Sequence, residues 1–286
     1  MKLDWIIRRA RNAVASKGGW RAAVRFLFSH PRSVGGLLRD DQRQNWYYDI
    51  GNDDEAAAFA AQVTASDIDR ARTFILELRN HQAFYTQLSE RLLQTRFRPH
   101  GRLPVGRRLS WYAIIRLVQP EICVETGVHD GLGSAVILQA LEDNFRLHGK
   151  AGQLISIDRP SSDLPADFPA QPGWLVPPTL RHRYDLRLGD ARQLLPAIAT
   201  EYSIGFFIHD SDHSPQHERF EIETVWPAMK PGGIVMTDNG PEVLRQFARQ
   251  ENTSFFTFRE QVLKHTYPGA SNSATVKPAS APNGLS

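Results

Sequence analysis

The sequence of 286 residues contains a single cysteine, Cys123. One cysteine cannot close a disulfide within the chain or build a cysteine-based zinc site, so both are excluded and a reducing compartment is the easier fit. Long apolar runs are also missing, since no segment approaches the roughly 18 apolar residues of a membrane-spanning helix. The remaining composition, 41% hydrophobic and 23% charged, is that of a soluble globular protein. We therefore predict a cytoplasmic location.

Acidic residues are scarce in the N-terminal segment. Residues 1–39 contain nine Lys and Arg but one acid, Asp4, and lack the apolar core and cleavage site of a secretory signal. Such a basic arm can make peripheral contact with the anionic inner face of a membrane or with an acidic protein. It can also be the solvated face of an amphipathic helix packed on the main domain. No basic-aromatic recognition motif follows, so nucleic acid is not a predicted partner.

Apolar spacing and the distribution of proline divide the chain into three parts. We predict a basic and helical N-terminal extension at 1–100, a catalytic domain at 101–267 and a disordered tail at 268–286. The tail is rich in Ser, Ala, Asn and Pro and has too little apolar material to pack. Within the catalytic domain, 159–184 holds too many prolines for a central strand or a helix interior. This insertion is either an ordered cap beside the binding site or a surface excursion.

The most informative stretch, 121–158, has the pattern of a strand, a glycine turn, a helix and a second strand. Ile122 to Val124 form a short apolar run without alternation, which suits a parallel strand covered on both faces. Three glycines within 127–133 let the backbone bend sharply, and a helix with a broad apolar face follows. The second strand ends at Asp158. This pattern predicts an α/β fold with a doubly wound, mostly parallel, Rossmann-like sheet.

The spacing of the glycines narrows the choice of ligand. They fall as G-x-x-x-G-x-G, which is not the dinucleotide fingerprint, and no Lys-Ser or Lys-Thr pair marks a phosphate loop. Glu125, at the end of the first strand, would repel phosphates but can pair with a cationic ammonium group. The pattern therefore favours a zwitterionic, phosphate-free ligand with a ribose.

From Glu125 to Gly131 the sequence resembles the class I S-adenosylmethionine-dependent methyltransferases, whose first motif is acid-x-Gly-x-x-x-Gly. The resemblance implies S-adenosylmethionine as cofactor, with Asp158 at the ribose hydroxyls. Asp190, which ends the third strand, would reach the adenine amino group. The cofactor-binding residues that the resemblance implies are Glu125, Gly127, His129, Gly131, Gly133, Asp158, Asp190 and Asp210.

A second group of polar residues follows two later strands. An apolar run at 204–208 leads to His209 and Asp210, and a Lys-Pro-Gly-Gly turn leads to a strand that ends in Asp238 and Asn239. Open α/β sheets keep their ligands at the carboxyl ends of their strands. Two carboxylates and an amide oxygen form a hard, all-oxygen set that suits Mg²⁺ or a similar divalent cation.

This second group resembles the metal-dependent O-methyltransferases of the catechol type and of the bacterial natural-product sugar type. The resemblance implies that Asp210, Asp238 and Asn239 are metal ligands. It places the general base three residues after the first ligand, at His213, where the catechol enzymes have a lysine and some sugar enzymes a histidine. Asp212 is the rival base. The same acids could instead cap the next helix.

We therefore predict an S-adenosylmethionine-dependent O-methyltransferase that acts on a small-molecule or sugar hydroxyl with the assistance of a divalent metal, Mg²⁺ or a similar cation. His209 and His217 are expected to be bystanders. Three alternatives remain open: a metal-independent N-methyltransferase, a relative of the cephalosporin hydroxylases, and a non-catalytic membrane-associated protein with a vestigial pocket.

Overall fold

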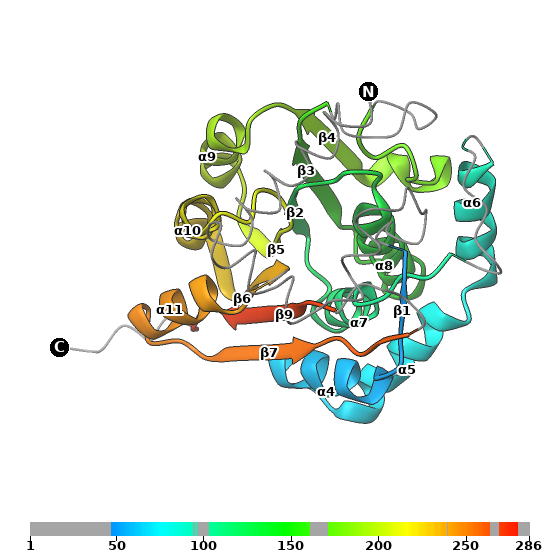
Figure 1. Ribbon diagram of the computed structural model, residues 1–286, viewed down its shortest axis with the longest axis horizontal. Coiled ribbons are helices and arrows are strands. Elements are labelled where there is room, and N and C mark those ends of the chain that lie inside the picture. The colour runs from blue at the N-terminus through cyan, green and yellow to red at the C-terminus, as the bar shows by residue number, and fades with distance from the viewer. Residues whose placement is uncertain are drawn as a thin grey trace, which may run out of the picture.

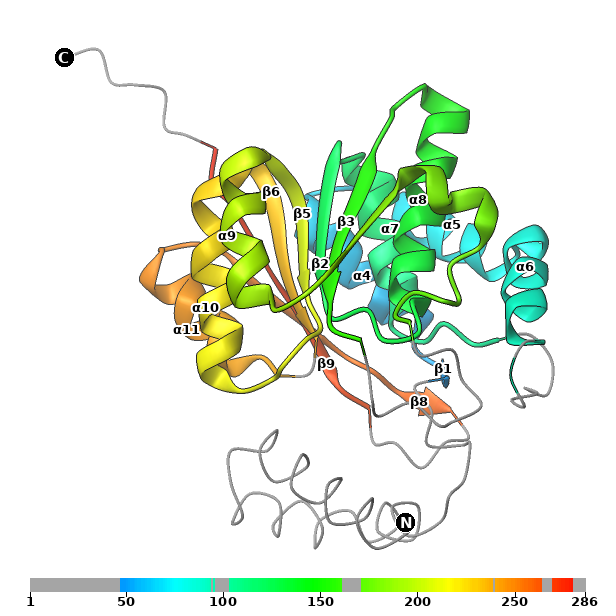
Figure 2. The same ribbon diagram turned by 90° about the horizontal axis from the view of Figure 1, so that it is seen from above.

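A sheet of seven strands with helices on both faces forms the centre of the molecule (Figures 1 and 2). The computed structural model describes residues 47–93, 95, 103–160, 171–238, 240–263 and 269–279. In spatial order the strands are β4 (Tyr184–Leu188), β3 (Gln153–Asp158), β2 (Ile122–Thr126), β5 (Ile204–His209), β6 (Met229–Asp238), β9 (Ser271–Val276) and β7 (Phe255–Arg259). β9 is antiparallel to β6 and β7, and the pairs among β4, β3, β2, β5 and β6 are parallel. The predicted doubly wound, mostly parallel α/β sheet is confirmed.

Each face of this sheet packs against its own set of helices. The elements on one side are α4 (Asp53–Thr64), α5 (Ile68–Arg79), α7 (Arg108–Val118) and α8 (Leu132–His148), and those on the other are α9 (Ala191–Glu201), α10 (Pro215–Val225) and α11 (Glu242–Gln250) (Figure 2). Successive strand residues point to opposite faces. Cys123 and Phe206 accordingly belong to the core on the α7 and α8 side, and Val124 and Phe207 to the core on the α9 and α10 side.

The predicted helical extension supplies α4, α5 and α6 (Gln82–Leu92). Phe59 of α4 and Ile75 of α5 are buried in the same hydrophobic cluster as Trp111 of α7 and Phe206 of β5. The helices at 53–92 are therefore part of the core of the catalytic sheet. The basic arm predicted at 1–39 lies outside the described residues.

The prediction of a disordered tail from Pro268 is wrong over Ser271–Val276, because these residues form β9 between β6 and β7. Four of the six side chains are polar, and Asn272 and Thr275 among them form side-chain hydrogen bonds in the interior. Trp111 Nε1 donates to Asn272 Oδ1 at 2.8 Å, and Thr275 Oγ1 donates to the Ser254 carbonyl at 2.7 Å. A pattern search for apolar residues cannot detect a buried strand of this kind.

The described part of the proline-rich insertion packs on the glycine turn. Trp174, Leu175 and Val176 are buried, and the backbone amide of Leu175 donates to the Asp130 carbonyl at 2.8 Å. Residues 161–170 lie outside the described residues. The segment at 171–176 is thus an ordered cover over the turn, which agrees with the first of the two interpretations of this insertion.

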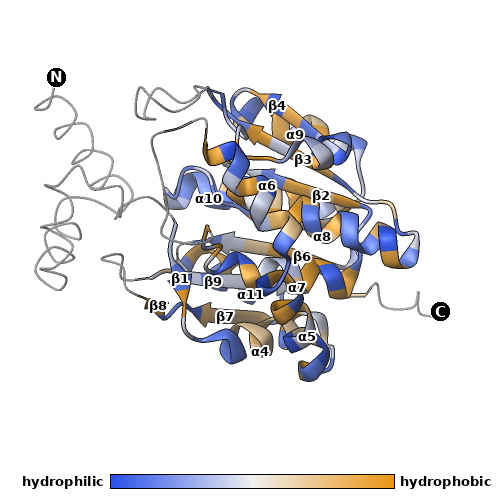
Figure 3. Ribbon diagram, turned by 90° about the vertical axis from the view of Figure 1, so that its right-hand side faces the viewer, coloured by the Kyte–Doolittle hydropathy of each residue, from blue (hydrophilic) through white to orange (hydrophobic). Residues whose placement is uncertain are grey.

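The helices carry both hydrophobic and hydrophilic residues along their length (Figure 3). Among the described residues, no helix combines the length and the apolar character needed to cross a membrane.

Candidate active site

The predicted site residues converge on the carboxyl edge of the sheet because the central strands are in register. Thr126 of β2 pairs with Ile157 of β3 and His209 of β5, and His209 pairs with Thr237 of β6. Asp158, Asp210 and Asp238 stand one position further along and therefore at the same edge. The two groups of acids that the sequence separates by up to 113 positions thus face one region.

The glycine turn is in direct contact with the loop that follows β5. Gly127 has a φ of +82°, and a Cβ at this position would lie 2.0 Å from the backbone oxygen of Asp210 and 2.7 Å from Cα of Ser211. Only glycine permits this approach. The Asp210 amide also donates to the Thr126 carbonyl at 2.9 Å. The predicted cofactor loop at Gly127 therefore packs directly against the predicted acceptor loop at Asp210.

Glu125 lies beneath the glycine turn rather than on its surface. Its side chain is buried, and its Oε2 accepts hydrogen bonds from Ser134 Oγ at 2.5 Å and Ser156 Oγ at 2.8 Å. Burial raises the pKa of Glu125 to about 7, against the lowering effect of the two hydroxyls. The carboxyl group is therefore poised to change charge near neutral pH.

Asp158 organises the glycine turn through backbone hydrogen bonds. Its Oδ2 accepts from the amides of Val128 at 2.9 Å and His129 at 2.7 Å. His129 has a φ of +53°, a left-handed conformation that is uncommon outside glycine, and these bonds help to hold it. Its imidazole is half exposed. The roles of Asp158 at a ribose and of His129 in cofactor binding stay predictions.

The remaining residues of the predicted cofactor site have structural duties. Gly131 is the N-cap of α8 and lies under Gly173 of the proline-rich insertion. Asp190 is the N-cap of α9, accepts from the Arg192 amide at 2.9 Å and pairs with Arg159. Capping is the ordinary use of an aspartate before a helix, and contact of Asp190 with an adenine stays a prediction.

Asp210 and Asp238 do lie together, but an arginine that the sequence analysis missed stands between them and Glu260. The guanidinium of Arg107 is buried, donates to Asp238 Oδ2, and lies 3.6 Å from Glu260 and 3.9 Å from Asp210. Burial tends to raise the pKa of Asp238, but the charge of Arg107 and the hydrogen bond with Asp210 act together against it, and this pKa is lowered. Burial and the charge of Asp238 raise the pKa of Asp210 well above its usual range. Ionisation is therefore disfavoured at Asp210 and favoured at Asp238.

The described residues do not fit a divalent metal at this place. The guanidinium of Arg107 already neutralises the carboxylate of Asp238, and a cation would have to displace it. No group of three or more His, Cys, Asp or Glu side chains in the described ranges is arranged to hold a metal ion. Asn239, the third predicted ligand, lies outside the described residues.

The two candidate bases are placed very differently. His213 Nε2 lies 3.7 Å from Asp210 Oδ1, so its ring faces the acid pair. Burial, with a contribution from the charge of His209, lowers the pKa of His213 to about 4, and the imidazole is therefore neutral at pH 7. Asp212 is exposed and its Oδ1 accepts from the Ser214 amide at 2.9 Å, as in a capping turn before α10. The geometry favours His213 over Asp212.

Behind His213 lies a buried hydrogen-bond network that includes His209 and His217, which were expected to be bystanders. His209 Nδ1 is 2.6 Å from Glu221 Oε2, and His217 Nε2 is 2.8 Å from Glu221 Oε1. Burial tends to raise the pKa of Glu221, but these hydrogen bonds outweigh it and bring the pKa to about 2. The rings of His209 and His213 meet edge to face with centroids 5.4 Å apart. Glu221 thus orients the histidine against which His213 packs.

The segment before β1 (Asp49–Ile50) also reaches this edge. The Tyr47 hydroxyl donates to the carboxylate of Asp130 in the glycine turn, and the Tyr48 hydroxyl donates to Glu260 at 2.9 Å. β1 pairs with β8 (Val262–Leu263) in a small separate sheet. No sequence pattern assigned these two tyrosines to the site.

One signal could have revealed Arg107. Arg107 and Arg108 are consecutive residues at the N-terminus of α7, where the positive end of the helix dipole disfavours cations. A local conflict of this kind usually has a functional or tertiary cause. Here the cause is the group of carboxylates at the carboxyl edge.

Comparison with known proteins agrees with this geometry. Residues 124–240 match the family model described as a methyltransferase domain. Residues 124–240 of this chain are thus similar to methyltransferase domains. The resemblance stated from the sequence and the class of enzyme, an S-adenosylmethionine-dependent methyltransferase, are thereby confirmed.

Several solved structures are similar to the methyltransferase chain at low identity. An O-methyltransferase from Bacillus cereus in complex with SAH has 16% identity and a TM-score of 0.47, with 67% of this chain and 91% of that chain covered. The O-methyltransferase TomG from Streptomyces achromogenes has 16% identity and a TM-score of 0.43, with 59% and 78% covered. A methyltransferase from Geobacter sulfurreducens has 17% identity and a TM-score of 0.44, with 69% and 87% covered. The search of curated proteins found no match.

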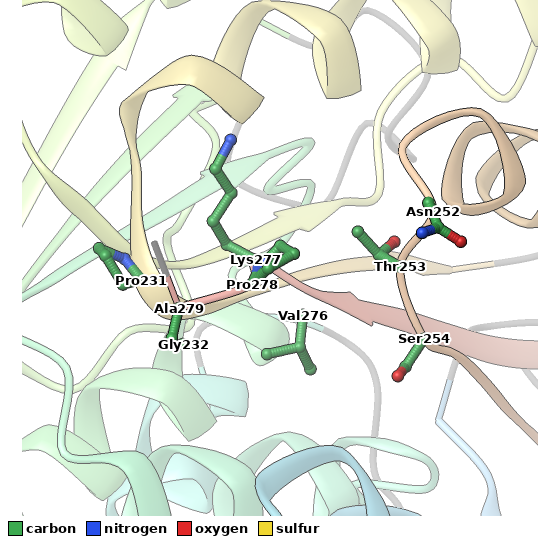
Figure 4. A pocket seen from close by; sticks show the side chains of 9 residues that line it. All are labelled: Pro231, Gly232, Asn252, Thr253, Ser254, Val276, Lys277, Pro278 and Ala279. Carbon is green, nitrogen blue, oxygen red and sulfur yellow. The ribbon is translucent and has the colours of Figure 1, made fainter. Parts of the chain in front are cut away.

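A surface hollow elsewhere on the methyltransferase is not part of this site. The hollow, about 540 Å³ in volume, is lined by residues at the start of β6, before β7 and after β9 (Figure 4). It lies at the amino edge of the parallel strands, opposite to the acids. Lys277 is the one ionisable residue among those that line it.

Proposed function

We propose that this protein transfers a methyl group from S-adenosylmethionine to a hydroxyl of a small molecule or sugar. The observation that carries the proposal is the contact at Gly127, which joins the glycine turn to the loop of Asp210 and His213. Methyl transfer is an in-line displacement, so donor and acceptor must be held against each other. Two ligand-binding loops in van der Waals contact at one sheet edge meet this requirement.

A hydroxyl acceptor is favoured over an amine because the site holds a base. A neutral amine attacks without prior loss of a proton, whereas a hydroxyl gains nucleophilicity when a base removes its proton. When bound, the cofactor supplies a sulfonium that makes its methyl group electrophilic. His213 is neutral at pH 7 and can accept the proton at Nε2, which faces Asp210. The carboxylate of Asp238 then stabilises the imidazolium by its negative charge.

In the proposed reaction the positive charge beside the acceptor comes from Arg107 rather than from a divalent metal. Arg107 is fixed by Asp238 and lies near Asp210 and Glu260, where the sequence analysis expected Mg²⁺. A guanidinium held in this way can donate hydrogen bonds to an acceptor oxygen without a metal. The proposed enzyme is thus a metal-independent O-methyltransferase, and a cytoplasmic location remains part of the proposal.

The proposal is tested in two steps, of which the first needs no acceptor. Titration calorimetry with S-adenosylhomocysteine should give binding that is unchanged by EDTA and weakened in an Asp158→Asn variant. If the intact protein does not bind S-adenosylhomocysteine, the assignment of S-adenosylmethionine as cofactor is wrong. If EDTA abolishes binding, the site requires a divalent metal.

The second step uses a panel of phenols, sugars and amines with product mass as the readout, which also separates methylation from hydroxylation. His213→Gln should keep the affinity for S-adenosylhomocysteine and lose most turnover on hydroxyl acceptors, typically ~100-fold or more for a general base. Asp212→Asn serves as the matched control and should retain activity. Methylation confined to amines would refute the assignment of oxygen as the acceptor.

A further inference from the structure

Arg108 is a buried cation with two unsatisfied nitrogen atoms among the residues that the structure describes. Its side chain is 6% exposed, and its Nε and Nη1 form no hydrogen bond within the described ranges. Two other buried arginines are paired: Arg116 bonds to Glu77 and Asn144, and Arg183 bonds to Glu142. Because buried charged groups are nearly always paired, the exception calls for an anionic ligand.

The guanidinium of Arg108 is held at the start of α8 beside the glycine turn. It lies over the ring of Trp111, with 5.5 Å between its Cζ and the ring centroid. A Cβ built on Gly133 would lie 3.6 Å from Arg108 Nε, 3.0 Å from the Trp111 ring and 2.9 Å from Glu125 Oε1. Arg108 and Glu125 therefore approach the same glycine from two directions, and any side chain there would enter the space that they share.

Arg108 and Glu125 are close but do not pair. Among the described residues no ion pair of 4.0 Å or less joins them, and Glu125 is instead bonded to two serine hydroxyls. The field of Arg108 nevertheless lowers the pKa of Glu125 and acts on Asp210 and Asp238 as well. A cation and an anion that face one glycine turn without neutralising each other are complementary to a zwitterion that has one group for each.

We propose that Arg108 binds the carboxylate of the cofactor's amino-acid group, while Glu125 takes its ammonium. This inference rests on the proposed function, since it assumes that S-adenosylmethionine binds at the glycine turn. A carboxylate on the acceptor is the other ligand with the right chemistry. The contact with Gly133 places Arg108 on the side of the cofactor loop, which favours the cofactor.

The test compares two ligands that differ by one carboxylate. S-adenosylhomocysteine and its decarboxylated analogue, which keeps the amine, are titrated calorimetrically into the wild type, Arg108→Met and Arg108→Lys. In Arg108→Met the affinity for S-adenosylhomocysteine should fall about 10- to 100-fold, the range expected for a lost bond between charged groups. The affinity of Arg108→Met for the analogue should stay within about twofold of the wild-type value. Arg108→Lys should lose less affinity for S-adenosylhomocysteine than Arg108→Met does.

Retained binding of the analogue also shows that Arg108→Met is folded. Arg146→Met, which removes an exposed arginine from α8, is the matched control and should change neither affinity. If Arg108→Met loses the same affinity for both ligands, the inference is wrong. It is also wrong if the affinity for S-adenosylhomocysteine is unchanged, and Arg108 would then be assigned to a carboxylate on the acceptor. If the wild type binds neither ligand, the proposed function itself fails, whereas strong binding that ignores Arg108 refutes the inference alone.

Discussion

At the scale of single residues, the sequence identified Glu125 as a site residue, but only the fold determines the pKa of its carboxyl group. Glu125 was found because an acid follows an apolar strand and precedes three glycines. Its pKa near 7 comes from burial beneath the turn, which no local pattern reveals. Arg107 was not identified from the sequence at all. Its partner Asp238 is 131 positions away, so no local pattern links the two residues.

The pKa of Glu125 leads to a prediction on cofactor binding. Below pH 7 the free protein holds a proton on Glu125, and an ammonium ligand must release it, because it pairs with the ionised form. The affinity for S-adenosylhomocysteine should therefore weaken about tenfold for each pH unit below 7 and level off above it. Calorimetry in buffers of different ionisation enthalpy should detect the released proton. In Glu125→Gln the slope should vanish, and a slope that survives this change would assign the proton elsewhere.

Arg107 is predicted to be essential for stability as well as for the charge of the site. Arg107→Met leaves the carboxylate of Asp238 buried without a counter-ion, which should lower the free energy of unfolding by about 3–5 kcal/mol in urea titrations. Removal of the stranded charge in Arg107→Met/Asp238→Asn should recover a large part of this loss. Arg146, whose side chain is exposed and pairs with Glu142, gives the contrast, since Arg146→Met should cost less than about 1 kcal/mol. A double variant no more stable than the single one would show that Arg107 acts through packing.

At the scale of elements, the periodic strands and helices were predictable and the polar strand was not. β2 and β5 contain apolar runs, β3 contains one that only Ser156 interrupts, and α8 has a broad apolar face, so each was located from the sequence. β9 escaped because Ser-Asn-Ser-Ala-Thr-Val resembles a linker. Its burial depends on partners such as Trp111 and Ser254, which are distant in the sequence.

The position of β9 between two strands makes it sensitive to proline. Ala274 pairs with Met236 on one side and Phe256 on the other, so Ala274→Pro removes a ladder donor inside the sheet and should cost about 3 kcal/mol or more. Ala279→Pro, the same substitution at an exposed position beyond the strand, should be neutral. Thermal unfolding followed by far-ultraviolet circular dichroism distinguishes them. Equal melting temperatures for the two variants would contradict the assignment of β9 to the sheet interior.

At the scale of the whole molecule, the sequence suggested a catalytic domain preceded by a helical extension, whereas the described fold has one continuous core across that boundary. Phe59, Ile75 and Leu78 of the extension share a cluster with Trp111 and the strands. The predicted boundary at 100–101 lies among prolines, which interrupt the helical pattern but not the packing. Such breaks can be recognised from the amino-acid composition. The packing of one helix against another cannot, because it depends on surfaces that come into contact only after folding.

A shared core implies that damage to the extension unfolds the methyltransferase sheet as well. Leu78 of α5 is fully buried, so Leu78→Ala should lower the free energy of unfolding by about 2–5 kcal/mol. Because the core is continuous, tryptophan fluorescence and far-ultraviolet circular dichroism should report one coincident transition. Leu76→Ala is the matched control on the same helix, since Leu76 is 57% exposed and its loss should change stability by less than about 0.5 kcal/mol. Two separate transitions, with the tryptophan signal unmoved by Leu78→Ala, would show instead that α4 and α5 fold as an independent unit.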